Sequence, residues 1–172
     1  MPIDLKDFIR DIPDFPKDGI LFRDIAPLLE NGEAFQAAMN RFHELVKDEK
    51  IDKIVGVESR GFIFGAPLAQ KLGVGFAMAR KQGKLPGDKI SICYDLEYGT
   101  NTIEMHSDSI TKGERVFIID DVLATGGTAG ATASLVEQLG GVISGMGFLL
   151  ELTFLEGRKN LPGREVNCLL EY

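Results

Sequence analysis

The sequence lacks the marks of several large protein classes. It has two cysteines, Cys93 and Cys168, each alone in an apolar run, so neither metal-ligand spacing nor a redox pair is present, and both are expected to be buried as small hydrophobic residues. No apolar run reaches the roughly 18 residues that a membrane span needs, and the N-terminus lacks the basic start and long apolar core of a secretory signal. We therefore expect a cytoplasmic protein with no membrane partner.

Basic residues are in the minority. The chain has 19 Lys and Arg against 26 Asp and Glu, a formal net charge of -7, whereas affinity for a phosphate backbone requires a basic surface. It also contains no Walker string ending in Gly-Lys-Ser/Thr and no G-x-G-x-x-G string, which disfavours P-loop hydrolases and dinucleotide oxidoreductases. We expect no nucleic-acid partner.

What is present is typical of one globular domain over residues 1–172, with 44% hydrophobic and 26% charged residues. Apolar runs alternate with stretches of helical spacing. This alternation predicts an α/β fold with a mostly parallel sheet covered by helices on both faces. The runs Ser91 to Tyr98 and Thr100 to Ile110 predict an antiparallel flap inserted in it.

The most informative stretch is Val116 to Ala131, VFIIDDVLATGGTAGA. Val116 to Ile119 predicts a buried strand, at whose carboxyl end Asp120 and Asp121 follow, where open α/β sheets bind their ligands. The loop Ala124 to Thr128 then offers backbone N–H groups and two hydroxyls to an anion, before a helix over 128–139. A carboxylate pair beside an anion loop suits a ribose 5-phosphate.

A second turn of this kind follows the strand expected over 51–57. Ser59, Arg60 and Gly61 precede a helix over 62–72, and an arginine there can bind phosphate oxygens with two parallel hydrogen bonds. After a third strand, Gly75 to Ala79, the basic and Gly/Pro-rich segment Arg80 to Lys89 is expected to leave the sheet as a mobile lid.

The remaining segments predict structure more than chemistry. A short helix is expected over Asp4 to Ile12, an irregular extended segment over Phe15 to Ile25, and a long amphipathic helix over Gly32 to Glu49. Strands are expected over 142–151 and 165–172. The segment between them, 155–163, reads only as a loop.

Together these strings resemble the type I phosphoribosyltransferases, and within that family the members that act on adenine. The strings that carry the resemblance are VFIIDDVLATGGTAGA, FPKDGILFRDIAPLL, VESRGFIFGAPLA, RKQGKLPG and LEYG. The resemblance implies the type I fold, with a hood over the base at 1–31 and a flexible lid at 80–102. It implies transfer of the phosphoribosyl group of 5-phosphoribosyl-1-pyrophosphate to adenine, with Mg²⁺ as cofactor and a homodimer as assembly.

The resemblance also assigns roles to individual residues. Asp120 and Asp121 would hold the ribose hydroxyls and Glu97 would act as the acid near the base. The 5-phosphate would bind Ala124, Thr125, Gly126, Gly127 and Thr128; pyrophosphate would bind Ser59, Arg60, Gly61, Arg80, Lys81 and Lys84; the base would bind Leu21, Arg23 and Val122. The Mg²⁺ would bridge pyrophosphate and ribose hydroxyls with no direct protein ligand.

Two alternatives stay open. The first is a phosphoribosyltransferase for another purine, which only the hood segment would distinguish. The second is a non-catalytic regulator that senses phosphoribosyl pyrophosphate and binds nucleic acid. The acidic net charge and the absence of an appended helix-turn-helix weigh against a regulator.

Overall fold

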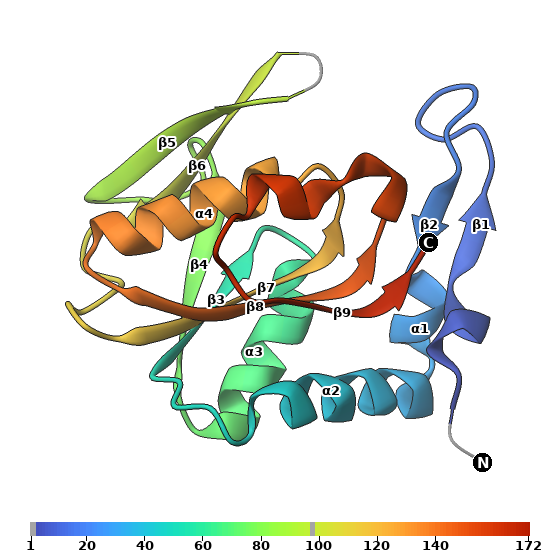
Figure 1. Cartoon of the computed structure of the whole chain (residues 1–172), viewed down its shortest axis with the longest axis horizontal. Coiled ribbons are helices and arrows are strands. Elements are labelled where there is room, and N and C mark those ends of the chain that lie inside the picture. Colours follow the sequence, from blue (N-terminus) through green and yellow to red (C-terminus); the bar gives the residue numbers. More distant parts are fainter. Residues whose placement is uncertain (1–2, 97–98) are drawn as a thin grey trace. The chain divides into compact units, whose positions relative to one another are not determined.

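The computed structural model of the chain describes residues 3–96 and 99–172. Its residues form two compact units, Met1–Arg41 and Phe42–Tyr172, and the boundary between them falls inside a helix. A single domain spanning 1–172 stays a prediction. Figure 1 shows the elements of both units in chain order.

The N-terminal unit contains a small antiparallel ribbon where a helix was predicted. A single 3-10 turn, Leu5–Phe8, is followed by β1, Arg10–Ile12, which pairs with β2, Phe22–Asp24. The predicted helix over Asp4 to Ile12 is therefore wrong, and the segment predicted to be irregular contains a strand. A helix this short is marginal by itself, whereas the ribbon gains two ion pairs between its strands, Arg10 with Asp24 and Arg23 with Asp11.

Two helices follow the ribbon. They are α1, Ala26–Glu30, and α2, Gly32–Val46, and the second agrees with the amphipathic helix predicted from Gly32. The start of α2 is capped by Asn31, whose side-chain oxygen accepts a hydrogen bond from the N–H of Ala34 at 2.9 Å.

The second unit is built on a seven-stranded sheet in the order β5-β6-β4-β3-β7-β8-β9. Its strands are β3 Lys53–Val57, β4 Gly75–Lys81, β5 Lys89–Asp95, β6 Thr100–His106, β7 Arg115–Leu123, β8 Val142–Glu151 and β9 Val166–Glu171. The five strands from β4 to β9 in this order are parallel, and β6 and β5 extend the sheet antiparallel. The predicted fold class, a mostly parallel sheet with an antiparallel flap, is confirmed.

Helices cover both faces of this sheet. The helix α3, Gly61–Leu72, packs against β3, β4 and β7, and α4, Gly127–Gln138, packs against β5 to β8. Figure 1 shows them on opposite sides of the sheet. The central strands are buried on both faces, so β3 and β7 are almost continuously apolar, with Ile54, Ile118 and Ile119 fully buried.

The segment after Ala79 departs from its prediction. Arg80 and Lys81 remain in β4, where Arg80 lies opposite Glu104 of β6, and Lys89 already begins β5. Pairing with β6 thus continues β4 through these two basic residues, and the Arg80 side chain is paired with the carboxylate of Glu58. The turn between the strands is held as well, because Leu85 is 4% exposed and the Pro86 carbonyl lies 2.9 Å from the His106 ring nitrogen Nε2.

The cysteine prediction is wrong for one residue. Cys93 is exposed on β5, an edge strand whose side chains alternate between exposed and half-buried, while Cys168 of β9 is partly buried. Burial raises the pKa of the Cys168 thiol to about 12, with the neighbouring Glu151 adding to the effect. That thiol is therefore a poor nucleophile.

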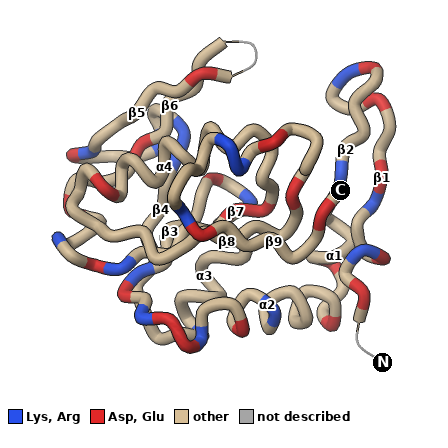
Figure 2. Tube along the Cα trace, viewed as in Figure 1, with Lys and Arg blue, Asp and Glu red and all other residues tan. Residues whose placement is uncertain are grey.

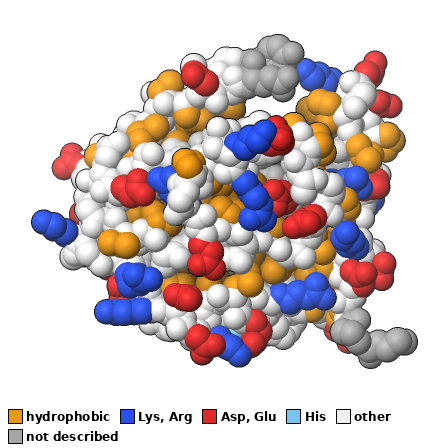
Figure 3. Space-filling view, in the orientation of Figure 1, with side chains coloured by type: hydrophobic (Ala, Val, Ile, Leu, Met, Phe, Trp, Pro, Cys, Tyr) orange, Lys and Arg blue, Asp and Glu red, His pale blue; other side chains and the backbone are white. Residues whose placement is uncertain are grey.

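Charge is distributed without a long run of one sign. Figure 2 shows acidic and basic residues interspersed along the trace of both units, and on the face seen in Figure 3 charged side chains alternate with small hydrophobic areas. Among the residues that the structure describes, no helix is long and apolar enough to cross a membrane.

Candidate active site

The strand β7 reaches beyond its neighbour on one side. It pairs with β3 only as far as Ile119, opposite Gly56, and continues beside β8 to Leu123, opposite Glu151. Asp120 and the residues after it therefore lie at the carboxyl edge of the sheet. Here the chain connections diverge, through α3 toward β4 on one side and through α4 toward β8 on the other, which is where open α/β sheets form their ligand crevice.

A small cavity of about 70 Å³ lies at this edge. It is called the phosphate-loop cavity below, and the loop Ala124 to Thr128 the phosphate loop, after the role predicted for these residues. It is lined by Asp120, Val122, Leu123, Ala124, Thr125, Gly126, Gly127, Thr128, Ala129 and Phe148. The helix α4 starts at Gly127, so its first N–H groups, which have no partner within the helix, are available to an anion there. All five residues predicted for the 5-phosphate are brought together in this cavity.

The two carboxylates of β7 differ in their surroundings. Asp120 lines the phosphate-loop cavity, whereas Asp121 is only 5% exposed and is not part of its lining. Asp121 forms an ion pair with Arg60, whose Nε lies 2.6 Å from Oδ2. Burial, and then the charge of Asp121, raise the pKa of Asp120 well above the ordinary carboxyl value.

The second predicted anion turn adjoins the first. Arg60 is the N-cap of α3 and Gly61 is its first residue. A Cβ on Gly61 would lie 2.8 Å from the Ile119 carbonyl oxygen and 3.0 Å from Asp120 Oδ1, so only glycine lets α3 begin directly against β7. Ser59, Arg60 and Gly61 are thereby held beside the two carboxylates, and the peptide bond between Glu58 and Ser59 is cis.

The basic residues of the predicted lid meet a carboxylate that sequence reasoning passed over. Glu58 forms an ion pair with the Arg80 guanidinium at 3.2 Å and accepts a hydrogen bond from the Lys81 N–H at 2.8 Å. Burial pushes the pKa of Glu58 upward, but the hydrogen bonds from Arg80 and Lys81 outweigh it, and the pKa lies below its ordinary value. Lys81 and Lys84 are exposed.

A second carboxylate at the base of the flap was also missed. Glu104 of β6 is 3% exposed, and its two oxygens accept hydrogen bonds from the Gly83 N–H at 3.1 Å and the Ser91 hydroxyl at 3.2 Å. It thus joins the turn after β4 to β5. An acidic residue in an alternating strand looks like a solvated one, so the sequence gives no signal for this role.

Two further contacts reach the phosphate loop from outside it. The Tyr94 hydroxyl of β5 lies 2.9 Å from the Thr128 hydroxyl. From the other side, the Asn160 side chain donates a hydrogen bond to the Thr125 carbonyl at 2.6 Å. Asn160 belongs to a 3-10 helix, Gly157–Asn160, inside the segment that the sequence identified only as a loop.

Comparison with known proteins agrees with this geometry. A family model described as a phosphoribosyl transferase domain matches residues 25–144. The adenine phosphoribosyltransferase of Maridesulfovibrio salexigens is 56% identical over 169 residues, covering 98% of this chain and 99% of that protein. That of Carboxydothermus hydrogenoformans is 55% identical over 170 residues, covering 99% of this chain and 100% of that protein.

The chain belongs to the adenine phosphoribosyltransferase family. Solved structures with this name share its fold. The enzyme of Thermoanaerobacter pseudethanolicus has a TM-score of 0.95 at 50% identity, covering 98% of each chain. The Saccharomyces cerevisiae enzyme, solved with an imino-altritol bisphosphate and adenine, has a TM-score of 0.89 at 44% identity, covering 94% of each chain.

Within an adenine phosphoribosyltransferase the remaining predicted residues concern the base. Leu21 is 44% exposed, and Arg23 lies in β2 with its guanidinium paired to Asp11 of β1. Val122 lines the phosphate-loop cavity in the other unit. Glu97, predicted as the acid near the base, lies outside the described residues.

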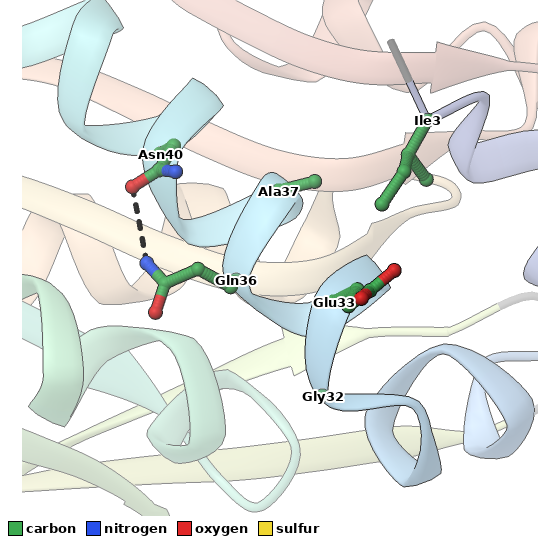
Figure 4. Close-up of a pocket in the computed structure, with 6 residues that line it drawn as sticks. All are labelled: Ile3, Gly32, Glu33, Gln36, Ala37 and Asn40. Atoms are coloured by element: carbon green, nitrogen blue, oxygen red, sulfur yellow. Dashed lines mark hydrogen bonds between the residues drawn. The ribbon is translucent and has the colours of Figure 1, made fainter. Parts of the chain in front are cut away.

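A larger hollow carries none of this chemistry. About 570 Å³ in volume, it lies on the N-terminal unit along the start of α2, and Figure 4 shows the six residues that line it, Ile3, Gly32, Glu33, Gln36, Ala37 and Asn40. Glu33 is their single ionisable side chain, and the Gln36 side chain donates to that of Asn40 at 3.1 Å. Its lining offers no cation to a phosphate.

Proposed function

We propose that this chain is a purine salvage enzyme that transfers the 5-phosphoribosyl group from 5-phosphoribosyl-1-pyrophosphate to adenine, forming AMP and pyrophosphate. The observation that carries the proposal is the junction of two anion turns at one edge of the sheet, the phosphate-loop cavity beside Asp120 and the turn of Arg60. A substrate with a phosphate at one end of a ribose and a pyrophosphate at the other matches two such turns. The choice of adenine as the base follows from the relatives, which are named adenine phosphoribosyltransferases.

The phosphate loop would bind the 5-phosphate, and the carboxylates would accept hydrogen bonds from ribose hydroxyls. The position of Asp120 in the lining of the phosphate-loop cavity supports this role. Asp121 is nearly buried and paired with Arg60. Its carboxylate would then lie close to the reacting sugar, where a transition state with oxocarbenium character develops positive charge.

Ser59, Arg60 and Gly61 would bind pyrophosphate together with Arg80, Lys81 and Lys84. A guanidinium has five N–H donors in a planar fork, so Arg60 can keep a bond to Asp121 and still bind phosphate oxygens. The Arg80 guanidinium is paired with the Glu58 carboxylate. Arg80 would therefore face the pyrophosphate with a negative charge beside it. The lysines carry the exposed charges that would meet the leaving group.

Mg²⁺ is proposed as the cofactor, and its chemistry is to neutralise charge on the leaving pyrophosphate. Among the residues that the structure describes, no three His, Cys, Asp or Glu side chains gather as a metal site. The carboxylate of Asp120 beside the phosphate-loop cavity fits Mg²⁺, which keeps several waters and commonly binds through substrate phosphates and one or two carboxylates. Asp120 and Asp121 would hold the ribose hydroxyls, which would bind the ion together with the pyrophosphate.

The base would be bound by backbone groups of Leu21 and Arg23 and packed against Val122, with Glu97 as the acid that serves the purine ring. The lid at 80–102 would exclude water, which otherwise competes with adenine for the sugar. We also propose a cytoplasmic location and a homodimer, since two-fold dimers are the commonest soluble assemblies. Light scattering that gave the mass of one chain, 18.8 kDa, at assay concentrations would contradict the dimer.

The decisive experiment is an incubation with Mg²⁺, phosphoribosyl pyrophosphate and each purine base in turn. We expect AMP from adenine, with hypoxanthine and guanine poorer by more than about a thousandfold in kcat/KM, because a site that pairs with an amine and a ring acceptor leaves buried groups unpaired against a 6-oxo base. Turnover of either within about tenfold of adenine would instead favour an enzyme for another purine.

The carboxylates are tested by the double change Asp120→Asn with Asp121→Asn. We expect most turnover to be lost while the fold is kept, since the amides preserve shape but remove the negative charge. Asp108→Asn is the matched control, because Asp108 is an exposed acid in the segment between β6 and β7 and is not among the predicted site residues. Full activity of the double variant would refute the assignment.

A further inference from the structure

The phosphate loop is packed against a segment from the C-terminal part of the chain. Gly126 and Gly157 approach each other so closely that a Cβ on Gly126 would lie 2.3 Å from the Gly157 carbonyl oxygen. A Cβ on Gly157 would likewise lie 2.3 Å from the Ala124 carbonyl oxygen. Real Cβ atoms do not come this close, so glycine is required on both sides of the contact. The 3-10 helix Gly157–Asn160 is thus in direct contact with the loop.

Within this contact, Asn160 fixes one peptide. Its Nδ2 donates to the Thr125 carbonyl at 2.6 Å, and since a carbonyl only accepts hydrogen bonds, the amide nitrogen must be the atom that faces it. In a planar trans peptide the C=O and the next N–H point in opposite directions. Holding the Thr125 carbonyl therefore directs the Gly126 N–H away from Asn160, so that it can serve the anion.

The loop itself does not fix that orientation. Gly126 has φ of 81°, and glycine populates positive and negative φ about equally, so the peptide before it can turn over at little cost. A reversed peptide would present a carbonyl oxygen to a phosphate in place of an N–H. The next peptide is fixed differently, because the Gly126 carbonyl accepts a hydrogen bond from the Gly130 N–H at 2.9 Å in the first turn of α4.

The support behind Asn160 is itself rigid. The neighbouring Arg158 donates from Nε and Nη2 to the carboxylate of Glu151, at 2.9 and 2.7 Å to Oε2, and from Nη1 to the Val166 carbonyl at 2.8 Å. Glu151 is 4% exposed at the end of β8, and Leu161, directly after Asn160, is 2% exposed. The 3-10 helix is therefore anchored to β8 and β9, and Asn160 donates from a fixed position.

We propose that Asn160 is a positioning residue that presets the phosphate loop for the 5-phosphate by holding the Thr125–Gly126 peptide in its anion-binding orientation. The inference rests on the proposed function, since it concerns the phosphate subsite of the same reaction. Asn160 acts through the loop backbone and makes no contact with the reacting atoms.

The test compares Asn160→Leu, which keeps the branched shape and removes the donor, with Asn160→Ala. For both we expect the KM for phosphoribosyl pyrophosphate and the calorimetric Kd for ribose 5-phosphate to rise about three- to tenfold, as for the loss of one hydrogen bond. The KM for adenine and the melting temperature should stay at wild-type values. A residue with a merely structural role would lower the melting temperature or the active fraction, and would leave the Kd of the folded protein unchanged.

Lys159→Ala is the matched control, because Lys159 lies in the same 3-10 helix and its exposed side chain pairs with Glu156, three residues earlier. It should bind ribose 5-phosphate as the wild type does. Unchanged binding in both Asn160 variants, with a wild type that binds, would overturn the positioning role alone. A wild-type protein that neither binds ribose 5-phosphate nor forms AMP would refute the proposed function, and the positioning role with it.

Discussion

Replacing Gly126 by alanine is expected to destabilise the protein through two separable effects. The first is backbone strain, because φ is 81° and a left-handed conformation costs a side-chain-bearing residue about 1 kcal/mol. The second is the contact of 2.3 Å that the new Cβ would make with the Gly157 carbonyl oxygen. That oxygen belongs to backbone and cannot rotate away, so overpacking should add about 2 kcal/mol.

Gly113 provides the matched control. Its φ is 88°, close to that of Gly126, yet a Cβ there would meet nothing within 4 Å. Gly113→Ala should therefore show the strain alone, about 1 kcal/mol, and Gly126→Ala about 3 kcal/mol. In a chain of this length, 1 kcal/mol shifts the melting temperature by about 3 °C, which gives losses of about 3 and 9 °C.

Thermal unfolding followed by circular dichroism measures both variants under one set of conditions. The difference between them isolates the contact between the phosphate loop and the 3-10 helix, since the strain is common to both. If Gly126→Ala melted at the temperature of Gly113→Ala, the close packing of these two backbones would not limit the loop, and the reasoning would fail.

Two further changes test the electrostatics and the flap. Asp120→Asn should melt at a higher temperature than the wild type at about pH 8, because burial and Asp121 raise the pKa of Asp120 and make its ionised form costly only in the folded state. This gain in melting temperature should shrink as the pH falls toward the ordinary carboxyl pKa. A gain independent of pH would contradict this. Tyr94→Phe removes the hydroxyl that lies 2.9 Å from the Thr128 hydroxyl, and should raise the KM for phosphoribosyl pyrophosphate about two- to fivefold in steady-state assays. An unchanged KM would show that this bond does not orient Thr128.

The parts of the fold that could be predicted from the sequence are those with a strong local pattern. The buried strand before Asp120, the glycine loop after it and the helix α4 each follow from residue type and spacing alone. The antiparallel flap was equally visible, because alternating residues over β5 and β6 are separated by a glycine turn. The glycine loop and the start of α4 also carry the five residues predicted for the 5-phosphate, Ala124 to Thr128.

What could not be predicted depends on partners distant in the chain. The strands Arg10–Ile12 and Phe22–Asp24 have three residues each and no alternation to read, and only their mutual pairing reveals them. Arg80 remains in a strand because β4 pairs there with β6, a partner more than twenty positions later in the chain. Asn160 resembles any polar loop residue until the fold brings it to the Thr125 carbonyl, 35 residues earlier. In each case a tertiary contact overrides a weak local preference.

The pairing of β3 with β7 sets the distance between the two anion turns. Each of the two anion turns continues directly from one of these strands, and neighbouring strands of a sheet lie about 4.8 Å apart. The separation between the turns is therefore a property of the hydrogen-bonded backbone and not of the loops. Substitutions in the loops can weaken anion binding at either turn, but they do not change the spacing of the two strands. The sheet therefore sets the length of the sugar phosphate that fits between the turns.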